Sequence, residues 1–238
     1  SLGCPPLPPP PPVPTAAYEL SWELPEAAAM AAGVANLTFD LSPPSARDFL
    51  PHAVGRPLAL EPAFKMSAEG GDGDGLRRRR AEIVIGVPTV KRDHQSYLGV
   101  TLKSLVENLT PEEASETLIV VLGAEPGDPA FARQVADEAR AAHPEAVASG
   151  LLEVVAPPAD FYPDPTQLRA TLGDEPERVA WRSKQNLDYA FLMMYARRRG
   201  VFYVQLEDDV LTKPGYVSAM RDHALDKTAQ GDPWFVID

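Results

Sequence analysis

The sequence predicts an α/β fold, in which a mainly parallel β-sheet carries helices on both faces. From residue 82 onward, short apolar runs rich in β-branched residues alternate with longer amphipathic segments. The short runs are typical of buried strands and the longer segments of helices. This alternating order favours parallel strands joined by right-handed crossovers, which place helices on both faces of the sheet.

Five runs are predicted as strands because each is short, apolar and rich in β-branched or aromatic residues. They are Ile83–Val87, Leu118–Leu122, Leu151–Val155, Phe202–Leu206 and Trp234–Ile237. Ligands of parallel sheets collect at the carboxyl ends of the strands. The loop after Val87 and the residues after Leu206 are therefore expected to converge at one edge of the sheet.

Four helices are predicted between and after these strands. The first has one apolar face, marked by leucines at steps of four, three and four, namely Leu98, Leu102, Leu105 and Leu109. A second is expected over Asp128–Ala142 and a third around Leu187–Met194. A fourth follows Lys213, with Pro214 expected in its first turn, where proline is well tolerated.

The chain divides into three expected regions. Residues 1–53 are interpreted as a mostly disordered, proline-rich stem or linker, because the first 14 residues hold eight prolines without apolar periodicity. Residues 54–80 are interpreted as an extended segment with a Gly-rich and an Arg-rich insert. Residues 81–238 are expected to form the α/β domain. No run of about 18 apolar residues is present, so no membrane span is expected in this sequence.

The composition limits the classes of function. With 238 residues, 45% of them hydrophobic and 24% charged, the chain can bury a substantial core. A formal net charge of -12 argues against nucleic-acid binding, which requires many Lys and Arg residues facing phosphates. An anionic ligand must therefore meet a local basic cluster. The single cysteine, Cys4, cannot form an internal disulfide.

Two triplets match the acceptor pattern for N-glycosylation, Asn36-Leu37-Thr38 and Asn108-Leu109-Thr110. Asn36 is the better candidate because it lies in the predicted linker. Asn108 lies near a predicted helix end, and Pro111 follows its Thr. Use of either triplet would mean that the chain is secretory.

The predicted strand Phe202–Leu206 ends in three consecutive carboxylates, Glu207-Asp208-Asp209. Like charges held together at a strand end repel one another, so a positive charge is expected to compensate them. Carboxylate oxygens are hard ligands that suit Mg2+ or Mn2+. The alternative is a solvated acidic turn that caps the next helix, since Asp favours helix starts and complements the helix dipole.

Two basic clusters are candidates for binding an anion. The loop after the first strand, Pro88–Arg92, offers backbone amides, the Thr89 hydroxyl, and the cations of Lys91 and Arg92. Ordinary surface charge is the alternative for these two cations. Arg182 and Lys184 form a second cluster beside a helix start, where backbone amides also favour anions. The Pro88–Arg92 loop matches neither the dinucleotide-binding fingerprint nor the P-loop.

A cation site, a phosphate-friendly loop and a second basic pair together suit a nucleoside diphosphate-sugar. A metal would bridge the diphosphate, while the acidic residues would bind the metal, the ribose or sugar hydroxyls. Transfer of a sugar requires stabilisation of the charge on the departing diphosphate, which a Lewis-acid cation provides.

Several blocks occur in the same order as in a known family: Ile85–Arg92, Ser96–Leu98, Gly150–Val154, Phe161–Pro163, Trp181–Tyr189 and Tyr203–Asp209. They resemble the N-acetylglucosaminyltransferase IV family, the α-1,3-mannosyl-glycoprotein 4-β-N-acetylglucosaminyltransferases. The resemblance runs from about Phe49 to Asp238. It implies a GT-A-like, Rossmann-like fold in a type II Golgi membrane protein, with a lumenal catalytic domain and an anchor that this sequence does not contain.

The resemblance also implies an activity. The expected reaction is an inverting, metal-dependent transfer of N-acetylglucosamine from UDP-GlcNAc, in β-1,4 linkage, to the α-1,3-mannose arm of N-glycans on glycoproteins. The expected cofactor is Mn2+ or another divalent cation, and association with other Golgi glycosyltransferases is a further expectation. The alternative is a catalytically inactive glycosyltransferase-like protein that binds and regulates another Golgi glycosyltransferase.

By this resemblance, Asp209 is expected to coordinate the metal, with Glu207 and Asp208 facing the ribose and the sugar. An inverting transfer needs a carboxylate general base near the acceptor hydroxyl. That base is expected beyond Asp238, because the resemblance ends shortly after the acidic residues.

The basic residues are expected to bind the donor by the same resemblance. Thr89, Lys91 and Arg92 would line the nucleotide end of the site. Arg182 and Lys184 would lie near the uracil or the diphosphate.

Overall fold

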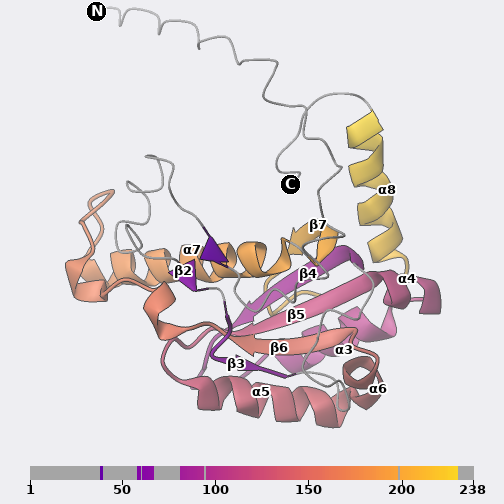
Figure 1. Ribbon diagram of the computed structural model, residues 1–238, viewed down its shortest axis with the longest axis horizontal. Coiled ribbons are helices and arrows are strands. Elements are labelled where there is room, and N and C mark those ends of the chain that lie inside the picture. The colour runs from indigo at the N-terminus through magenta and orange to yellow at the C-terminus, as the bar shows by residue number, and fades with distance from the viewer. Residues whose placement is uncertain are drawn as a thin grey trace, which may run out of the picture. The chain divides into compact units, whose positions relative to one another are not determined.

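The computed structural model describes residues 38–39, 58–59, 61–66, 81–93, 95–197 and 199–229 of the chain. All of them belong to the unit Asn36–Asp238, whereas the unit Ser1–Ala35 lies outside the described residues. The main sheet has five strands in the order β3-β6-β5-β4-β7 (Figure 1). The predicted α/β class with a mainly parallel sheet is confirmed. The predicted strand Trp234–Ile237 lies outside the described residues.

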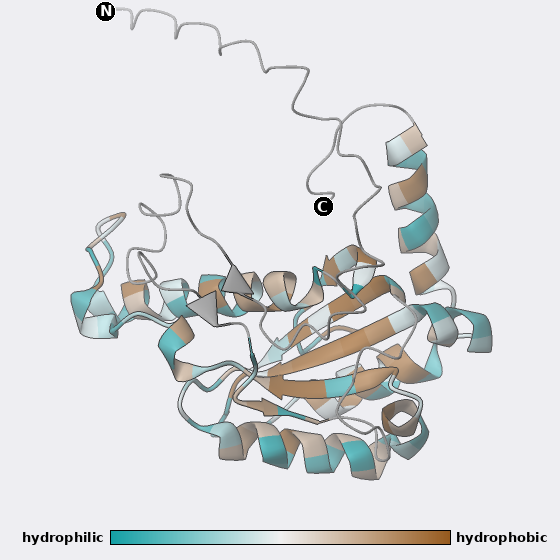
Figure 2. Ribbon diagram, in the orientation of Figure 1, coloured by the Kyte–Doolittle hydropathy of each residue, from teal (hydrophilic) through white to brown (hydrophobic). Residues whose placement is uncertain are grey.

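Four strands of this sheet run parallel. In the centre, β4 (Ala81–Thr89) pairs with β5 (Thr117–Gly123) on one side and with β7 (Gly200–Gln205) on the other. β6 (Leu152–Ala156) extends the sheet beyond β5. Every residue of β5 is buried, and the central strands are hydrophobic along most of their length (Figure 2). Such continuous apolar runs are what a sheet covered on both faces requires.

Three short strands were not predicted. β3 (Phe64–Lys65) pairs antiparallel with β6 and makes the sheet mixed. β1 (Thr38–Phe39) and β2 (Leu58–Ala59) form a separate antiparallel pair. Each of these strands has only two residues, so no periodic pattern in the sequence marks it.

Alternate residues of β4 point to opposite faces of the sheet, as the strand period requires. Val84 packs on one face against α7 (Pro176–Ala196), with Phe191 and Leu192 at the centre of that contact. Ile85 packs on the other face against α3 (Leu98–Glu107). The sheet is thus covered on both sides by helices, as predicted.

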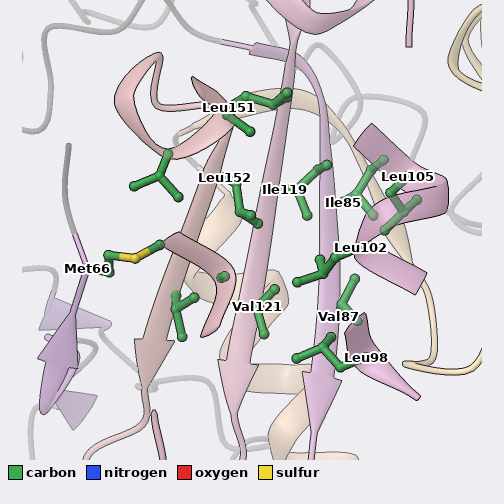
Figure 3. Packing of buried hydrophobic residues seen from close by; sticks show 14 of the residues in the cluster. Met66, Ile85, Val87, Leu98, Leu102, Leu105, Ile119, Val121, Leu151 and Leu152 are labelled. Atoms are coloured by element: carbon green, nitrogen blue, oxygen red, sulfur yellow. The ribbon is translucent and has the colours of Figure 1, made fainter. Parts of the chain in front are cut away.

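The face that carries Ile85 holds the larger cluster of buried side chains. Three of the leucines predicted to mark the first helix lie in α3 and in this cluster, and Figure 3 shows Leu98, Leu102 and Leu105 near Ile85 and Val87. The fourth, Leu109, follows the end of α3 and packs against the cluster while partly exposed. The helices that complete this face are α5 (Pro129–Ala142), α6 (Pro144–Ala148) and the start of α8 (Tyr216–Ala229). None of the helices in the described part of the chain combines the length and apolar character needed to cross a bilayer.

Side-chain caps fix several helix starts. α4 (Pro111–Glu116) follows Thr110, whose hydroxyl accepts the Glu113 N–H at 3.2 Å, while the Glu113 carboxylate accepts the Thr110 N–H at 3.0 Å. α5 follows Asp128, whose carboxylate accepts the Phe131 N–H at 3.3 Å. Between β6 and α7 lie two 3-10 helices, Ala159–Phe161 and Pro165–Gln167.

The prediction that Pro214 lies in the first turn of the last helix is wrong. α8 begins at Tyr216, two residues later. Gly215 stands between them with a φ of 79°, a left-handed conformation that cannot belong to a right-handed helix. Pro214 therefore belongs to the turn before α8.

Candidate functional site

The strand order reverses between β4 and β7. From β4 the chain adds β5 and then β6 on one side, and β7 later returns to the other side of β4. In open α/β sheets, ligands bind outside the carboxyl ends of the strands at such a switch point. Thr89 is the last residue of β4, and Glu207-Asp208-Asp209 follow β7 directly after Leu206. The expectation that these two segments meet at one edge is therefore confirmed.

Asp208 is the centre of a hydrogen-bond network at this edge. Its carboxylate accepts the Thr89 hydroxyl at 2.6 Å and the Arg92 guanidinium at 2.8 Å, and only 4% of the residue is exposed. The Thr101 hydroxyl of α3 donates to the Asp208 carbonyl at 2.8 Å. The positive charge expected beside these carboxylates is supplied, for Asp208, by Arg92.

Arg92 links the buried network to the surface. Its side chain is 33% exposed, and its guanidinium lies 5.2 Å from the centre of the Tyr97 ring, within the range of a cation–π contact. One Nη atom of Arg92 is hydrogen-bonded to Asp208, and one face of the guanidinium lies against the Tyr97 ring. These two contacts fix the orientation of the side chain. The other N–H groups of a guanidinium in such a position can meet an anion.

Glu207 and Asp209 have exposed side chains on either side of the buried Asp208. The Tyr189 hydroxyl of α7 donates to Glu207 Oε1 at 3.3 Å, and Gln185 Nε2 donates to the Tyr189 hydroxyl, also at 3.3 Å. Within the part of the chain that the structure describes, the Asp209 carboxylate has no hydrogen bond or ion pair. Among the described residues, Asp209 is thus the one of the three carboxylates that has no partner.

The described residues do not form a preassembled metal cage, since no group of three or more His, Cys, Asp or Glu side chains among them could hold a metal ion. Two exposed carboxylates, Glu207 and Asp209, nevertheless fit a cation that arrives with its substrate. Mg2+-like ions are commonly bound through one or two carboxylates, while phosphate oxygens and water complete the shell. The donor set therefore fits a diphosphate-borne cation, and the coordination by Asp209 stays a prediction.

Glu125, directly beyond β5, belongs to the same edge. Its carboxylate accepts the backbone N–H of Lys91 at 2.8 Å, which ties the loop after β4 to the end of β5. The Ala124 N–H donates to the Thr89 carbonyl at 2.8 Å and continues the link between the two strands. The Lys91 side chain is exposed at this edge.

Arg182 and Lys184 lie within α7, so the prediction that they lie beside a helix start is wrong. The Arg182 side chain contacts the loop that precedes α7. Its guanidinium pairs with Asp174 and donates to the Thr171 hydroxyl at 2.7 Å. Among the described residues, it makes no hydrogen bond to the network around Asp208. The predicted role of Arg182 in donor binding stays a prediction.

Lys184 lies in a cluster with two other side chains. Its ammonium donates to Asp188 Oδ2 at 2.9 Å, and the Tyr162 hydroxyl donates to Asp188 Oδ1 at 2.6 Å. Asp188 is 3% exposed. Burial raises the pKa of the Asp188 carboxyl above its usual value, although both hydrogen bonds oppose the shift. Burial is also the main cause of the raised pKa of Tyr162.

Sequence reasoning missed Glu125, Tyr162, Asp188 and Tyr189 as site residues. Glu125 could have been found as the acidic residue just beyond a predicted strand end. The pairs Lys184–Asp188 and Gln185–Tyr189 have the four-residue spacing of side chains that meet on a helix surface. The contact between Tyr162 and Asp188 has no such signal, because it joins a loop to a helix.

Comparison with known proteins gives consistent matches. The family model described as the MGAT4 conserved region matches residues 73–238. The chain is 43% identical over 195 residues to alpha-1,3-mannosyl-glycoprotein 4-beta-N-acetylglucosaminyltransferase B of Mus musculus. The matched region is 82% of this chain and 34% of that protein. It is 41% identical over 198 residues to alpha-1,3-mannosyl-glycoprotein 4-beta-N-acetylglucosaminyltransferase A of Rattus norvegicus, and here the matched region is 83% of this chain and 36% of that protein. The chain thus spans about a third of the length of these curated relatives, and no solved structure matches it.

Proposed function

Because the chain belongs to the family of the MGAT4 conserved region, we propose that it forms the donor-binding part of an α-1,3-mannosyl-glycoprotein 4-β-N-acetylglucosaminyltransferase. The donor is UDP-GlcNAc and the acceptor is the α-1,3-mannose arm of an N-glycan on a glycoprotein. The observation that carries the proposal is the Asp208 network. It joins the basic loop after β4 to the acidic residues after β7, at the switch point of the sheet.

In the proposed reaction, the 4-hydroxyl oxygen of the acceptor mannose attacks the anomeric carbon of N-acetylglucosamine from the side opposite the diphosphate. The bond between the anomeric carbon and the diphosphate oxygen breaks, UDP leaves, and the hydroxyl proton passes to a general base. The anomeric configuration is therefore inverted. The base itself is assigned to a residue beyond Asp238.

The residues of this chain bind and orient the donor. Asp208 keeps the Arg92 guanidinium in place, so that its remaining N–H groups can meet the charge that develops on the departing diphosphate. The Thr89 hydroxyl and the Lys91 ammonium line the same nucleotide end. The Glu207 carboxylate, held by the Tyr189 hydroxyl, is suited to accept hydroxyl protons of the ribose or the sugar.

Asp209 would hold the divalent cation, in the first instance Mn2+. When bound, the cation supplies Lewis-acid stabilisation of the diphosphate leaving group. The exposed position of Asp209 beside a charge-compensated Asp208 supports this division of roles. An N-glycan acceptor also implies a lumenal location in the Golgi, where association with other glycosyltransferases would be accessible to the protein.

The test is calorimetric titration of UDP-GlcNAc into the folded full-length protein, with Mn2+ and then with a chelator. Binding is expected with Mn2+ and its loss with the chelator. Asp209→Asn is expected to weaken binding at least about tenfold, because loss of even a hydrogen-bond partner of a metal ligand typically costs about 10–100-fold in metal affinity. Asp226→Asn, an exposed change on α8, is the matched control and should bind as the parent does.

A folded protein that binds no UDP-GlcNAc in Mn2+, or an Asp209→Asn variant that binds unchanged, would contradict the proposal. Incubation of the same protein with donor and a biantennary N-glycan separates the enzyme from an inactive regulator. The enzyme adds the mass of one N-acetylglucosamine, whereas an inactive protein that binds the donor leaves the glycan mass unchanged.

A further inference from the structure

The cluster of Lys184, Asp188 and Tyr162 has a hydrogen-bond arrangement that limits what Lys184 can bind. An ammonium has three N–H donors and no acceptor. One donor is directed to Asp188, and 29% of the Lys184 side chain remains exposed. Each carboxylate oxygen of Asp188 already accepts one hydrogen bond, from Lys184 or from the Tyr162 hydroxyl. Lys184 therefore offers N–H donors to a ligand in a fixed direction.

The charges around Lys184 do not favour a phosphate. Asp188 neutralises the ammonium directly. The Glu125 carboxylate also acts on this cluster, since its charge contributes to the raised pKa of both Tyr162 and Asp188. One ammonium beside two carboxylates has no excess positive charge to offer a diphosphate. A neutral oxygen, which needs an N–H donor but no net charge, fits the cluster better.

The position of the cluster along the sheet points to the nucleoside end of the donor. Tyr162 follows β6 and Glu125 follows β5, whereas Arg92 follows β4 and Asp209 follows β7. Neighbouring strands lie about 4.8 Å apart, so the ends of β6 and β7 are separated by roughly 14 Å over three such steps. A donor whose diphosphate lies at Arg92 and Asp209 can extend along this edge and bring its base toward Lys184.

Resting on the function proposed above, we propose that Lys184 donates a hydrogen bond to a neutral oxygen of the donor nucleoside, the C4 carbonyl of the uracil ring, and does not bind the diphosphate. Asp188 and Tyr162 are positioning residues that hold the ammonium at this point. The cluster is thus a determinant of specificity for a pyrimidine that carries a carbonyl where cytosine carries an amine.

The test compares Lys184→Met with the parent in calorimetric titrations of UDP, CDP and inorganic pyrophosphate, all with Mn2+ and in the full-length protein. Lys184→Met is expected to weaken UDP binding about tenfold, the usual cost of losing one hydrogen bond from a charged donor. Pyrophosphate binding should stay unchanged, and the preference for UDP over CDP should fall. Lys103→Met, which removes an exposed lysine on α3 that pairs with Glu107, is the matched control.

Tyr162→Phe tests the positioning role, because it removes one hydroxyl and no charge. It is expected to reduce the ratio of UDP to CDP affinity while leaving the affinity for pyrophosphate intact, a pattern that a general loss of stability would not produce. Asp188→Asn should reduce the same ratio, and Tyr162→Phe keeps the test valid if the Asp188 variant fails to fold.

Three outcomes would overturn the assignment of Lys184. The first is an equal loss of pyrophosphate and UDP affinity, which would make it a phosphate ligand. The second is a loss seen with UDP-GlcNAc but not with UDP, which would move the contact to the sugar. The third is unchanged binding of every ligand. A parent protein that binds pyrophosphate with Mn2+ but no UDP or UDP-GlcNAc would instead contradict the proposed function itself.

Discussion

Arg92 and Asp208 form an ion pair of 2.8 Å that joins the loop after β4 to the residues after β7. The carboxylate is almost fully buried, while a third of the guanidinium side chain faces solvent. One residue therefore supplies both the charge that makes the buried carboxylate tolerable and the N–H groups available to an anion. If Arg92 binds the donor as we propose, stability and ligand binding are coupled at this pair.

Arg92→Met is expected to lower the free energy of unfolding by about 2 kcal/mol, less than the 3–5 kcal/mol typical of a fully buried pair because Arg92 is partly exposed. The double variant Arg92→Met/Asp208→Asn should recover part of that loss, since it leaves no unpaired charge. Urea denaturation of the single and double variants measures the coupling. Strictly additive effects would show that the pair contributes no interaction energy.

Gly86→Ala is expected to destabilise the sheet by roughly 1–3 kcal/mol, the usual cost of overpacking a core. A Cβ at Gly86 would overlap the Tyr203 hydroxyl and come within 2.9 Å of the ring carbons. Tyr203 would have to move, and its hydrogen bond to Gln205 would be disturbed. Gly99→Ala is the control, because nothing lies within 4 Å of its Cβ position in α3, and it should be stabilising. Equal unfolding midpoints for both variants would contradict the prediction.

Lys65 is expected to make stability depend on pH above neutrality. Burial, reinforced by the charge of Arg199, lowers the pKa of Lys65 to about 8 from 10.5. Glu153 lies 3.8 Å from the Lys65 ammonium but also accepts Arg199 at 2.9 Å, so its charge is shared. Between pH 8 and pH 10.5 the unfolded chain binds more protons at this group, and its contribution to stability therefore rises with pH.

Lys65→Met separates this contribution from the other titrating groups. Below pH 8 the cost of burying the charged ammonium is fully present in the parent, so the variant should gain most there. The stability difference between variant and parent should shrink as the pH is raised to 10. Urea midpoints at pH 7, 8, 9 and 10 measure it, and a difference that stays constant over this range would exclude Lys65 as the cause.

Asn108 is expected to carry no glycan, although it lies in an acceptor triplet. Its Nδ2 donates to the Ser104 carbonyl and to the Thr212 carbonyl, each at 3.0 Å, and ties α3 to the loop before α8. A sugar on this nitrogen would remove one of the two donors. Asn108→Gln should therefore leave the mass of the secreted protein's glycans unchanged and lower stability by about 1 kcal/mol. Asn36→Gln is the comparison, and loss of a glycan from the Asn108 variant alone would refute the prediction.

The strands of the parallel sheet were predictable because short, continuous runs of β-branched residues are typical of strands buried on both faces. β4 and β5 each extend one or two residues beyond the predicted runs Ile83–Val87 and Leu118–Leu122. The long α7 begins at Pro176, several residues before the helix start that was predicted beside Arg182 and Lys184, because its first turns are mostly polar and exposed. Local turn geometry at Gly215 displaced the start of α8, and no periodic pattern encodes such a turn.

The candidate site was predictable in its place more than in its contacts. Strand order brought the loop after β4 to the acidic residues after β7, and that order follows from general rules of parallel sheets. The sequence did not predict which cation pairs with Asp208, because Lys91 was as good a candidate as Arg92. The pairing of Arg182 with Asp174 and the contact of Tyr162 with Asp188 depend on loop conformations that the sequence pattern does not specify.

The hydrogen bond between Thr89 and Asp208 joins residues 119 positions apart in the chain. During synthesis, β4, β5 and β6 emerge and can pair with one another well before β7 exists. Contacts between residues so far apart in the chain form slowly, so we expect the docking of β7 beside β4 to be a late step of folding. A nascent chain halted before that step has a sheet but only half of the edge that we assign to the donor. Occupancy of this edge by a nucleotide would therefore report that the chain has finished folding.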